Sequence, residues 1–182
     1  MAFDGFMWFE GNSNGAPPVN GETLDDFFKQ HKAFAIKSFS VDAENPTSVG
    51  SAGGGSGTGK AKLNPFKVSK WTDNCSPSLF LTCCTGGHYK KAHIAVRKAG
   101  AQTAGTGNKY LHFTFRQVFV CNIEWSGESE DELPTENVQF AYGSLEMQYI
   151  PQTSTGGQGT PNIQCWNQVT NSQDSDVPDP TV

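Results

Sequence analysis

The 182-residue chain lacks several features that would place it in a common functional class. It has no apolar run near the ~20 residues that a membrane helix needs, and its start, MAFDGFMWFEG, has no basic n-region and no continuous apolar stretch. We therefore expect a chain without membrane insertion and without a cleaved secretory signal. Its five cysteines are an odd number and two are adjacent, which favours reduced thiols made in the cytosol over a disulfide framework.

Charge of one sign is missing from two long segments. No acidic residue lies between Asn74 and Ile123, where six basic residues give +6, and no Lys or Arg lies between Glu124 and Val182, where ten acids give −10. Two interpretations stay open. The segments could be neighbouring strands whose charges compensate within one molecule. They could also lie on different faces, so that one copy attracts the next.

Composition and periodicity favour one all-β domain over residues 1–182. Short apolar runs are separated by Gly, Ser, Thr and Asn, and 12% of the residues are aromatic. Three clear strands change their apolar phase midway: residues 33–41, residues 110–121 at Arg116 and Gln117, and residues 138–149 at Gly143 and Ser144. Long strands do this at the corners of a barrel or between packed sheets. The pattern predicts a β-barrel or tight sandwich.

One short helix is predicted from Ser76, which could cap it, because Pro77 suits the first helical position and Gly86 suits the end. A second helix is considered over residues 23–32, where Leu24, Phe27 and Phe28 fall on one side. The glycine-rich residues 45–60 predict a flexible extended loop between two early strands, and residues 151–182 predict a polar tail.

Several motifs suggest chemistry, but their context argues against it. GGSGTGKA, at 54–61, resembles a phosphate-binding loop, yet Ala61 replaces the hydroxyl residue and a strand follows in place of a helix. Cys83 and Cys84 are adjacent on a helix and His88 and His93 have an odd spacing on a strand, so neither pair converges on zinc. We expect no metal and no cofactor.

Other reaction classes have equally little support. A cysteine nucleophile with a histidine base is formally possible, but no surrounding motif supports it. The acidic residues 128–136 match neither a calcium loop nor a glycosidase pair. Nucleic acid could be drawn to the +6 segment, but the −10 segment would oppose it, so we expect no nucleic-acid partner and no catalytic residues.

Three stretches in combination resemble one family: SPSLFLTCCTGGHYKKAHIAVRKAG, KYLHFTFRQVFV and LPTENVQFAYGSLEMQY. They resemble the haemolysin-coregulated protein family, Hcp, the tube subunit of bacterial type VI secretion systems, over most of residues 1–150. Two departures are the absence of a Trp-Gly pair after Ile36 and the QCWNQV run in the tail. The family motif residues fall at Ser76, Pro77, His88, Arg97, Lys98, Gly100, Leu133, Pro134, Thr135 and Glu136.

The resemblance implies a β-barrel of two packed antiparallel sheets with a helix on the outside. It also implies a structural, non-enzymatic subunit that forms hexameric rings stacking into a hollow tube, which a contractile sheath expels. Implied partners are further copies of the chain, a tip spike protein, sheath proteins and small effectors in the lumen. Assembly would take place in the cytoplasm before secretion without a signal peptide. Ring stacking would use the loop residues Asn45, Ser48, Gly53, Gly54, Gly55 and Lys60.

A phage-like tail tube protein would share this fold and assembly. An enzyme that uses thiols or a metal on a similar barrel is the alternative from a different class. The two classes differ in whether a convergent polar set exists and in whether the purified chain forms a ring several times its own mass.

Overall fold

The computed structural model describes residues 3–13, 15–48, 57–98, 109–153 and 157–177. Its elements run along the chain in this order: β1 (Phe3–Ser13), η1 (Phe28–His31), β2 (Phe34–Ile36), β3 (Ser38–Ser40), β4 (Ala43–Glu44), β5 (Thr47–Ser48), β6 (Gly57–Thr58), β7 (Lys62–Leu63), β8 (Phe66–Trp71), α1 (Ser76–Thr85), β9 (His88–Lys98), β10 (Lys109–Ser126), β11 (Thr135–Ala141), β12 (Ser144–Tyr149) and β13 (Asn162–Asn167).

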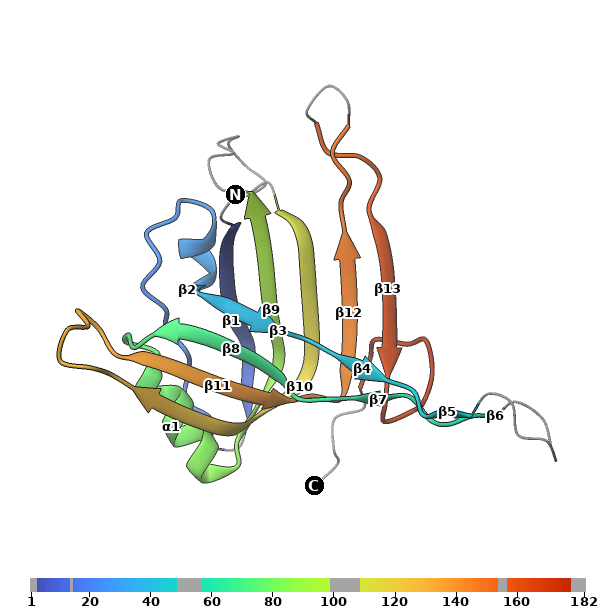
Figure 1. Ribbon diagram of the computed structural model, residues 1–182, viewed down its shortest axis with the longest axis horizontal. Coiled ribbons are helices and arrows are strands. Elements are labelled where there is room, and N and C mark those ends of the chain that lie inside the picture. Colours follow the sequence, from blue (N-terminus) through green and yellow to red (C-terminus); the bar gives the residue numbers. More distant parts are fainter. Residues whose placement is uncertain (1–2, 14, 49–56, 99–108, 154–156, 178–182) are drawn as a thin grey trace.

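The described residues place nine strands in one antiparallel sheet. Its main path runs β2-β1-β9-β10-β11-β8-β3, and β12 and β13 continue outward from β10. In Figure 1, β1, β9, the first part of β10 (yellow), β12 and β13 stand side by side in one layer, and β8 and β11 cross them in a second layer. The expected all-β class with two packed antiparallel layers is confirmed.

The bend of β10 joins the two layers. Its first part pairs with β12 up to Arg116, and its second part pairs with β11 from Phe119 onward. Gln117 lies between these parts with a φ of 54°, a left-handed conformation that turns the strand and shifts its apolar phase. The phase change expected at Arg116 and Gln117 is therefore confirmed as a corner.

A second corner lies at Lys37, where the two ends of the sheet path meet in sequence, and a third lies at Gly143, between β11 and β12. β2 pairs with β1, β3 pairs with β8, and the Lys37 N–H donates to the Ser69 carbonyl at 2.7 Å. The chain therefore passes from one layer to the other within a few residues, as its phase change predicts. The barrel consists of two layers joined at corners, because its hydrogen-bonded ladder stays open between β2 and β3.

The main core fills the space between the two layers. Phe66 stacks between Phe115 and Phe140, with ring centroids 3.9 and 4.7 Å from its own. Helix α1 lies against β10, buries Leu79, and bonds its Thr82 hydroxyl to the Tyr89 hydroxyl at 2.7 Å. A ten-residue helix is marginal alone, so this packing holds it on the outside of the sheet.

A smaller apolar cluster covers the other face of β1 and β9. It contains Phe6, Trp8 and Phe28, the last of which is fully buried and belongs to η1. The helix considered for residues 23–32 is therefore only a four-residue 3-10 turn. The Asp25 carboxylate accepts the backbone N–H groups of Phe27 and Phe28 before it.

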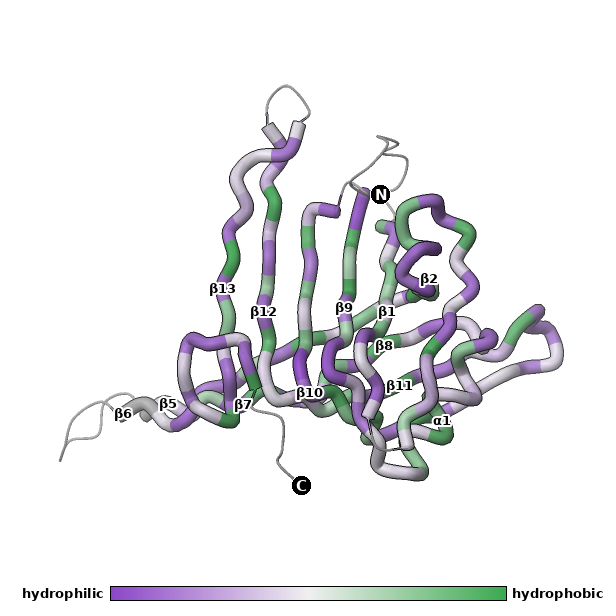
Figure 2. Tube along the Cα trace, turned by 180° about the vertical axis from the view of Figure 1, so that it is seen from behind, coloured by the Kyte–Doolittle hydropathy of each residue, from purple (hydrophilic) through white to green (hydrophobic). Residues whose placement is uncertain are grey.

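Two narrow strand pairs project from the body of the molecule. β12 and β13 stand beside β10 and alternate between hydrophilic and hydrophobic segments (Figure 2). β5 and β6 pair within the loop segment 45–60, beyond the short pair of β4 and β7. The single domain over residues 1–182, with a flexible loop at 45–60 and a polar tail at 151–182, stays a prediction.

Candidate functional site

The candidate motifs for metal and nucleotide chemistry lie in ordinary structural positions. Within the described ranges, no group of three or more His, Cys, Asp or Glu residues has the arrangement of a metal site, and no helix is long and apolar enough to cross a membrane. The five cysteines are all free thiols. The chain after Lys60 continues into strand β7, so the glycine-rich segment does not open a helix.

Three of the four histidines gather around Trp8 on the outer face of β1, β9 and β10. The Trp8 ring stacks on His93, His31 and His112, with centroid distances of 4.7, 5.0 and 5.7 Å. His93 and His112 lie 5.4 Å apart with nearly parallel rings. Stacked rings direct their nitrogen lone pairs past one another, so this cluster, here called the histidine stack, is built for packing and does not converge on a cation.

Two members of the histidine stack, His93 and His112, are uncharged at neutral pH. Burial lowers the pKa of His93 to about 3, and the positive charges of Lys91, Lys109 and Arg116 act in the same direction. Burial likewise lowers the pKa of His112 to about 3, with further lowering by Lys109. The Glu10 carboxylate lies 3.4 Å from His93 Nε2, but it is half exposed and solvent screens its attraction.

The motif residues at the start of α1 and of β11 meet in a buried ionic network. Lys70 Nζ donates to Asp73 at 2.8 Å and to the Ser76 hydroxyl at 3.1 Å, and lies 3.6 Å from the Glu136 carboxylate. Lys70 and Glu136 are both completely buried. Ser76 is the first helical residue, and its hydroxyl accepts the Asp73 N–H instead of capping the helix. The network fastens α1 to β8 and β11.

The remaining motif residues also support the fold. His88 contacts the Ser13 hydroxyl at 2.7 Å, Arg97 forms ion pairs with Asp4 and Asp25, and Lys98 donates to Gln152. The Thr135 hydroxyl accepts a hydrogen bond from Lys37 Nζ, and the Pro134 carbonyl accepts one from the Thr72 N–H. Leu133 is half exposed, and Pro77 lies in the first turn of α1.

The predicted stacking residues are only partly within the described chain. Asn45 and Lys60 are exposed next to β5 and β6, and Ser48 belongs to β5. Gly53, Gly54 and Gly55, like the motif residue Gly100, lie outside the described residues. Their part in ring stacking stays a prediction.

The sheet presents unpaired backbone along β13. The Asn167 N–H donates to the Ser172 carbonyl at 2.9 Å, away from β12. The hydrogen-bonding direction of the backbone alternates from residue to residue along an antiparallel strand, so the peptide groups of Cys165 and Ile163 also point away from β12. On that side β13 meets no strand of the described chain. Beside this edge, Met147, Tyr149 and Ile163 are 43 to 50% exposed.

A second unpaired edge lies on the opposite side of the same layer. β2 covers β1 only at Gly5 to Met7, so the stretch from Phe9 to Ser13 has no strand partner on that side among the described residues. One layer therefore ends in two different open edges, β13 and the second half of β1. Such edges are templates for pairing with another chain.

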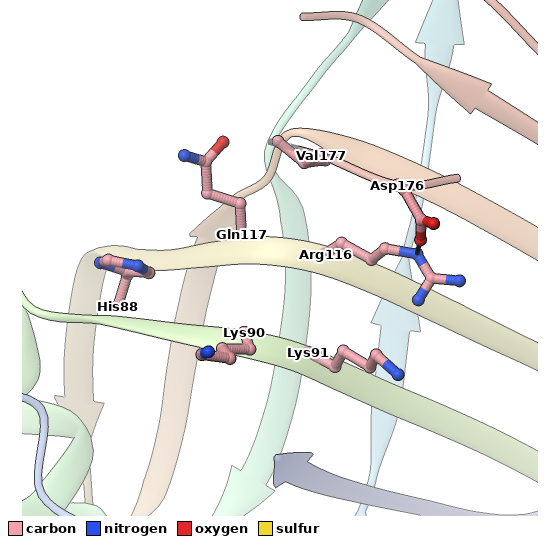
Figure 3. A pocket seen from close by; sticks show the side chains of 7 residues that line it. All are labelled: His88, Lys90, Lys91, Arg116, Gln117, Asp176 and Val177. Atoms are coloured by element: carbon pink, nitrogen blue, oxygen red, sulfur yellow. Dashed lines mark ion pairs between the residues drawn. The ribbon is translucent and has the colours of Figure 1, made fainter. Parts of the chain in front are cut away.

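The basic segment and the acidic segment meet at a recess between β9 and β10, which we call the basic recess. It has a volume of about 190 Å³ and is lined by His88, Lys90, Lys91, Arg116, Gln117, Asp176 and Val177 (Figure 3). Arg116 pairs with Glu146 and Asp176 of the acidic segment, whereas Lys91 and Arg97 pair with acids of the N-terminal third. Compensation within the molecule is thus partial.

Comparison with known proteins agrees with this fold. A sequence model of the family described as "Type VI secretion system effector, Hcp" matches residues 6–149. The chain belongs to the Hcp family. It is 32% identical over 109 residues to the protein Hcp1 of Pseudomonas aeruginosa, a match that spans 59% of this chain and 65% of that relative.

Solved structures show the same Hcp fold. A type VI secretion system protein has a TM-score of 0.81 at 26% identity, with 95% of this chain and 100% of that one covered. Hcp1 from Salmonella typhimurium has a TM-score of 0.71 at 22% identity, with 96% and 100% covered. The Hcp resemblance inferred from the three sequence stretches is therefore confirmed.

Sequence reasoning missed the histidine stack and the basic recess. Trp8 and His93 are cross-strand partners, and His112 lies two residues from Thr114, the partner of His93 on the next strand. Only the strand register brings these residues together. The available signal was the presence of His93 and His112 in two consecutive long strands that carry no nearby acid.

Proposed function

We propose that this chain is the structural subunit of a type VI secretion tube, which forms hexameric rings that stack into a hollow tube. Membership of the Hcp family supports the role, and the two open sheet edges support the ring. Because the edges differ, the β13 edge of one copy would pair with the β1 side of the next. A contact between unlike surfaces repeats until the rotation closes a ring.

The apolar residues beside β13 support the same proposal. Three large side chains of β12 and β13 are about half exposed, and exposed apolar surface next to an open edge marks an association surface. A lumen that carries small effectors, contacts with spike and sheath proteins, and assembly in the cytoplasm before secretion are the finer parts of the proposal. The role is structural and involves no reaction.

Light scattering of the purified chain over a concentration series tests the ring. Six copies of the 19.7 kDa chain give about 118 kDa, and electron micrographs should show hollow particles. A monomer that persists at high concentration would refute the proposal.

A proline at the β13 edge locates the contact. Ile163→Pro removes an outward N–H without removing a hydrogen bond to β12, so it should abolish rings while leaving a folded monomer. Ile163→Val is the matched control because it keeps the N–H and an apolar side chain, and it should form rings normally. Rings of equal yield from both variants would show that β13 is not the contact.

A further inference from the structure

The basic recess brings two like charges together on neighbouring strands. Lys91 and Arg116 are directly opposite each other in the ladder of β9 and β10, which destabilises a sheet. Apart from the tail, the described residues offset them only with the partly exposed Glu10 and Glu146, at 4.0 and 3.6 Å. Gln117, held at a φ of 54°, lies next to Arg116 on the wall of the recess. The recess therefore has the chemistry of a carboxylate site.

Part of the chain's own tail occupies this site, and the body of the protein anchors that tail through its backbone. The Ser144 hydroxyl donates to the Ser175 carbonyl at 2.6 Å, and the Asn167 side-chain amide donates to the Asp176 carbonyl at 2.9 Å. Ser144 and Asn167 are completely buried. Val177 lies so close to Gly143 that a Cβ there would come within 3.0 Å of it.

The side chains of the tail satisfy Arg116 poorly. Arg116 Nη2 donates to the Ser175 hydroxyl at 3.0 Å, but the Asp176 carboxylate lies 3.8 Å from Nε, and Nε has no hydrogen-bond acceptor although it is buried. The Asp176 side chain is 90% exposed, so water screens its attraction. A carboxylate placed across Nε and Nη2 would bind Arg116 through two parallel hydrogen bonds and would be stronger.

The acidic turn between β10 and β11 has the matching chemistry. It contains Glu128, Glu130, Asp131 and Glu132, all exposed, and its Glu-Ser-Glu sequence resembles the Asp174-Ser175-Asp176 of the docked tail. It cannot reach Arg116 of its own chain. Ser126 lies ten positions along β10 from Arg116, which is about 33 Å of chain at the rise of a strand, and in Figure 1 the turn lies at the end of the molecule away from the tail.

We infer that the basic recess receives the acidic turn, Glu128 to Glu132, of a second copy, and that the tail residues Ser175 and Asp176 hold the recess until that copy displaces them. The tail thereby weakens association between copies and sets the concentration at which it begins. This inference rests on the proposed function, because only a self-assembling chain presents many such turns to many such recesses.

Three variants of the full chain test the displacement. Removal of Ser175 and everything after it should tighten association by about tenfold, which corresponds to about 1.4 kcal/mol, and should make it more sensitive to NaCl. The double variant Ser175→Ala and Asp176→Asn should act in the same direction while leaving the backbone anchors in place. Asp26→Asn is the matched control, because it removes one exposed negative charge far from the recess and should change nothing.

Neutralising the turn identifies the occupant. Glu128→Gln, Glu130→Gln, Asp131→Asn and Glu132→Gln, combined with the tail truncation, should cancel the gain and leave an association constant no higher than that of the unmodified chain. Sedimentation velocity over a concentration series measures each constant. Truncation without effect would overturn the inference, and so would a gain that survives neutralisation of the turn, since a different surface would then fill the recess.

Hydrogen exchange gives a readout that needs no variant. On assembly of the unmodified chain, the amides of the acidic turn should become protected and those of residues 172–177 should exchange faster. A tail that stays equally protected in the assembled state would contradict displacement. If no variant forms rings under any condition, the proposed function fails; if rings form and associate equally with and without the tail, only this inference fails.

Discussion

Acid should unfold this protein through the histidine stack. His93 and His112 have pKa values of about 3 in the folded chain and about 6.5 when unfolded. The folded state therefore binds fewer protons than the unfolded state between pH 6.5 and 3. Because the unfolded chain gains those protons, the free energy of unfolding falls as pH drops through this window and is fully retained above pH 7.

The magnitude follows from the size of the lowering. Between pH 7.5 and pH 4.5, protonation of the unfolded chain at one such histidine lowers the free energy of unfolding by about 2.7 kcal/mol. Two independent sites would give about 5 kcal/mol. The two rings are adjacent and their titrations are coupled, so the sum is smaller and we expect about 3 to 5 kcal/mol. With a urea slope near 2 kcal/mol per M, the midpoint should fall by about 1.5 to 2.5 M.

Variants separate the loss of stability caused by the histidines from the loss caused by carboxylates, which also titrate at low pH. Phenylalanine keeps a flat ring against Trp8, so His93→Phe with His112→Phe should preserve the packing and remove the titration. Urea midpoints at pH 7.5 and 4.5, at a concentration where the particle mass is constant, give the difference. If the unmodified chain and the double variant lose stability in parallel, burial of the neutral histidines is not the cause and the reasoning is wrong.

Two further predictions concern the buried network and the thiols. Lys70→Met should lower the free energy of unfolding by about 3 to 5 kcal/mol, because Glu136 keeps its buried charge without a cation. The added change Glu136→Gln should restore part of the loss in urea melts, and additive effects would show that the two side chains are uncoupled. With a thiol reagent, the exposed Cys84 and Cys121 should react in minutes, whereas Cys75 should react only on unfolding, because it is fully buried and burial raises its pKa. Peptide mass spectrometry measures both rates, and fast labelling of Cys75 in the folded chain would contradict the packing of α1.

The corners of the fold could be predicted from sequence because they leave a local trace. An alternating strand that turns a corner must exchange its inward and outward faces, and this exchange is visible at Arg116 and Gln117 without knowledge of any partner strand. The helix was predictable for the same reason, since Pro77 and Gly86 act within one turn of their own positions. The prediction of a second helix was wrong. The Asp25 carboxylate and the burial of Phe28 against β1 hold residues 23–32 in a shorter turn and override their local pattern.

The histidine stack could not be predicted, because its members are far apart in sequence and meet only through register. The pairing of Trp8 with His93 belongs to a register that β1 and β9 keep without a shift, from Phe3 opposite Lys98 to Ser13 opposite His88. The periodicity of one strand does not say which residue of the other strand lies opposite it.

The charge split is compensated only in part within one molecule. Arg116 and Asp176 lie in one molecule and compensate each other, although weakly, since the pair is long and its carboxylate is exposed. The acidic turn lies too far along β10 to join them, and all four of its acidic side chains are exposed. Because Asp176 compensates Arg116 weakly and the acidic turn carries four exposed carboxylates, our proposal has the turn of a second copy replace Asp176. Segment charge alone therefore predicts attraction between copies without a place for it, and the strand length and the unsatisfied Arg116 Nε are what place the contact that we propose.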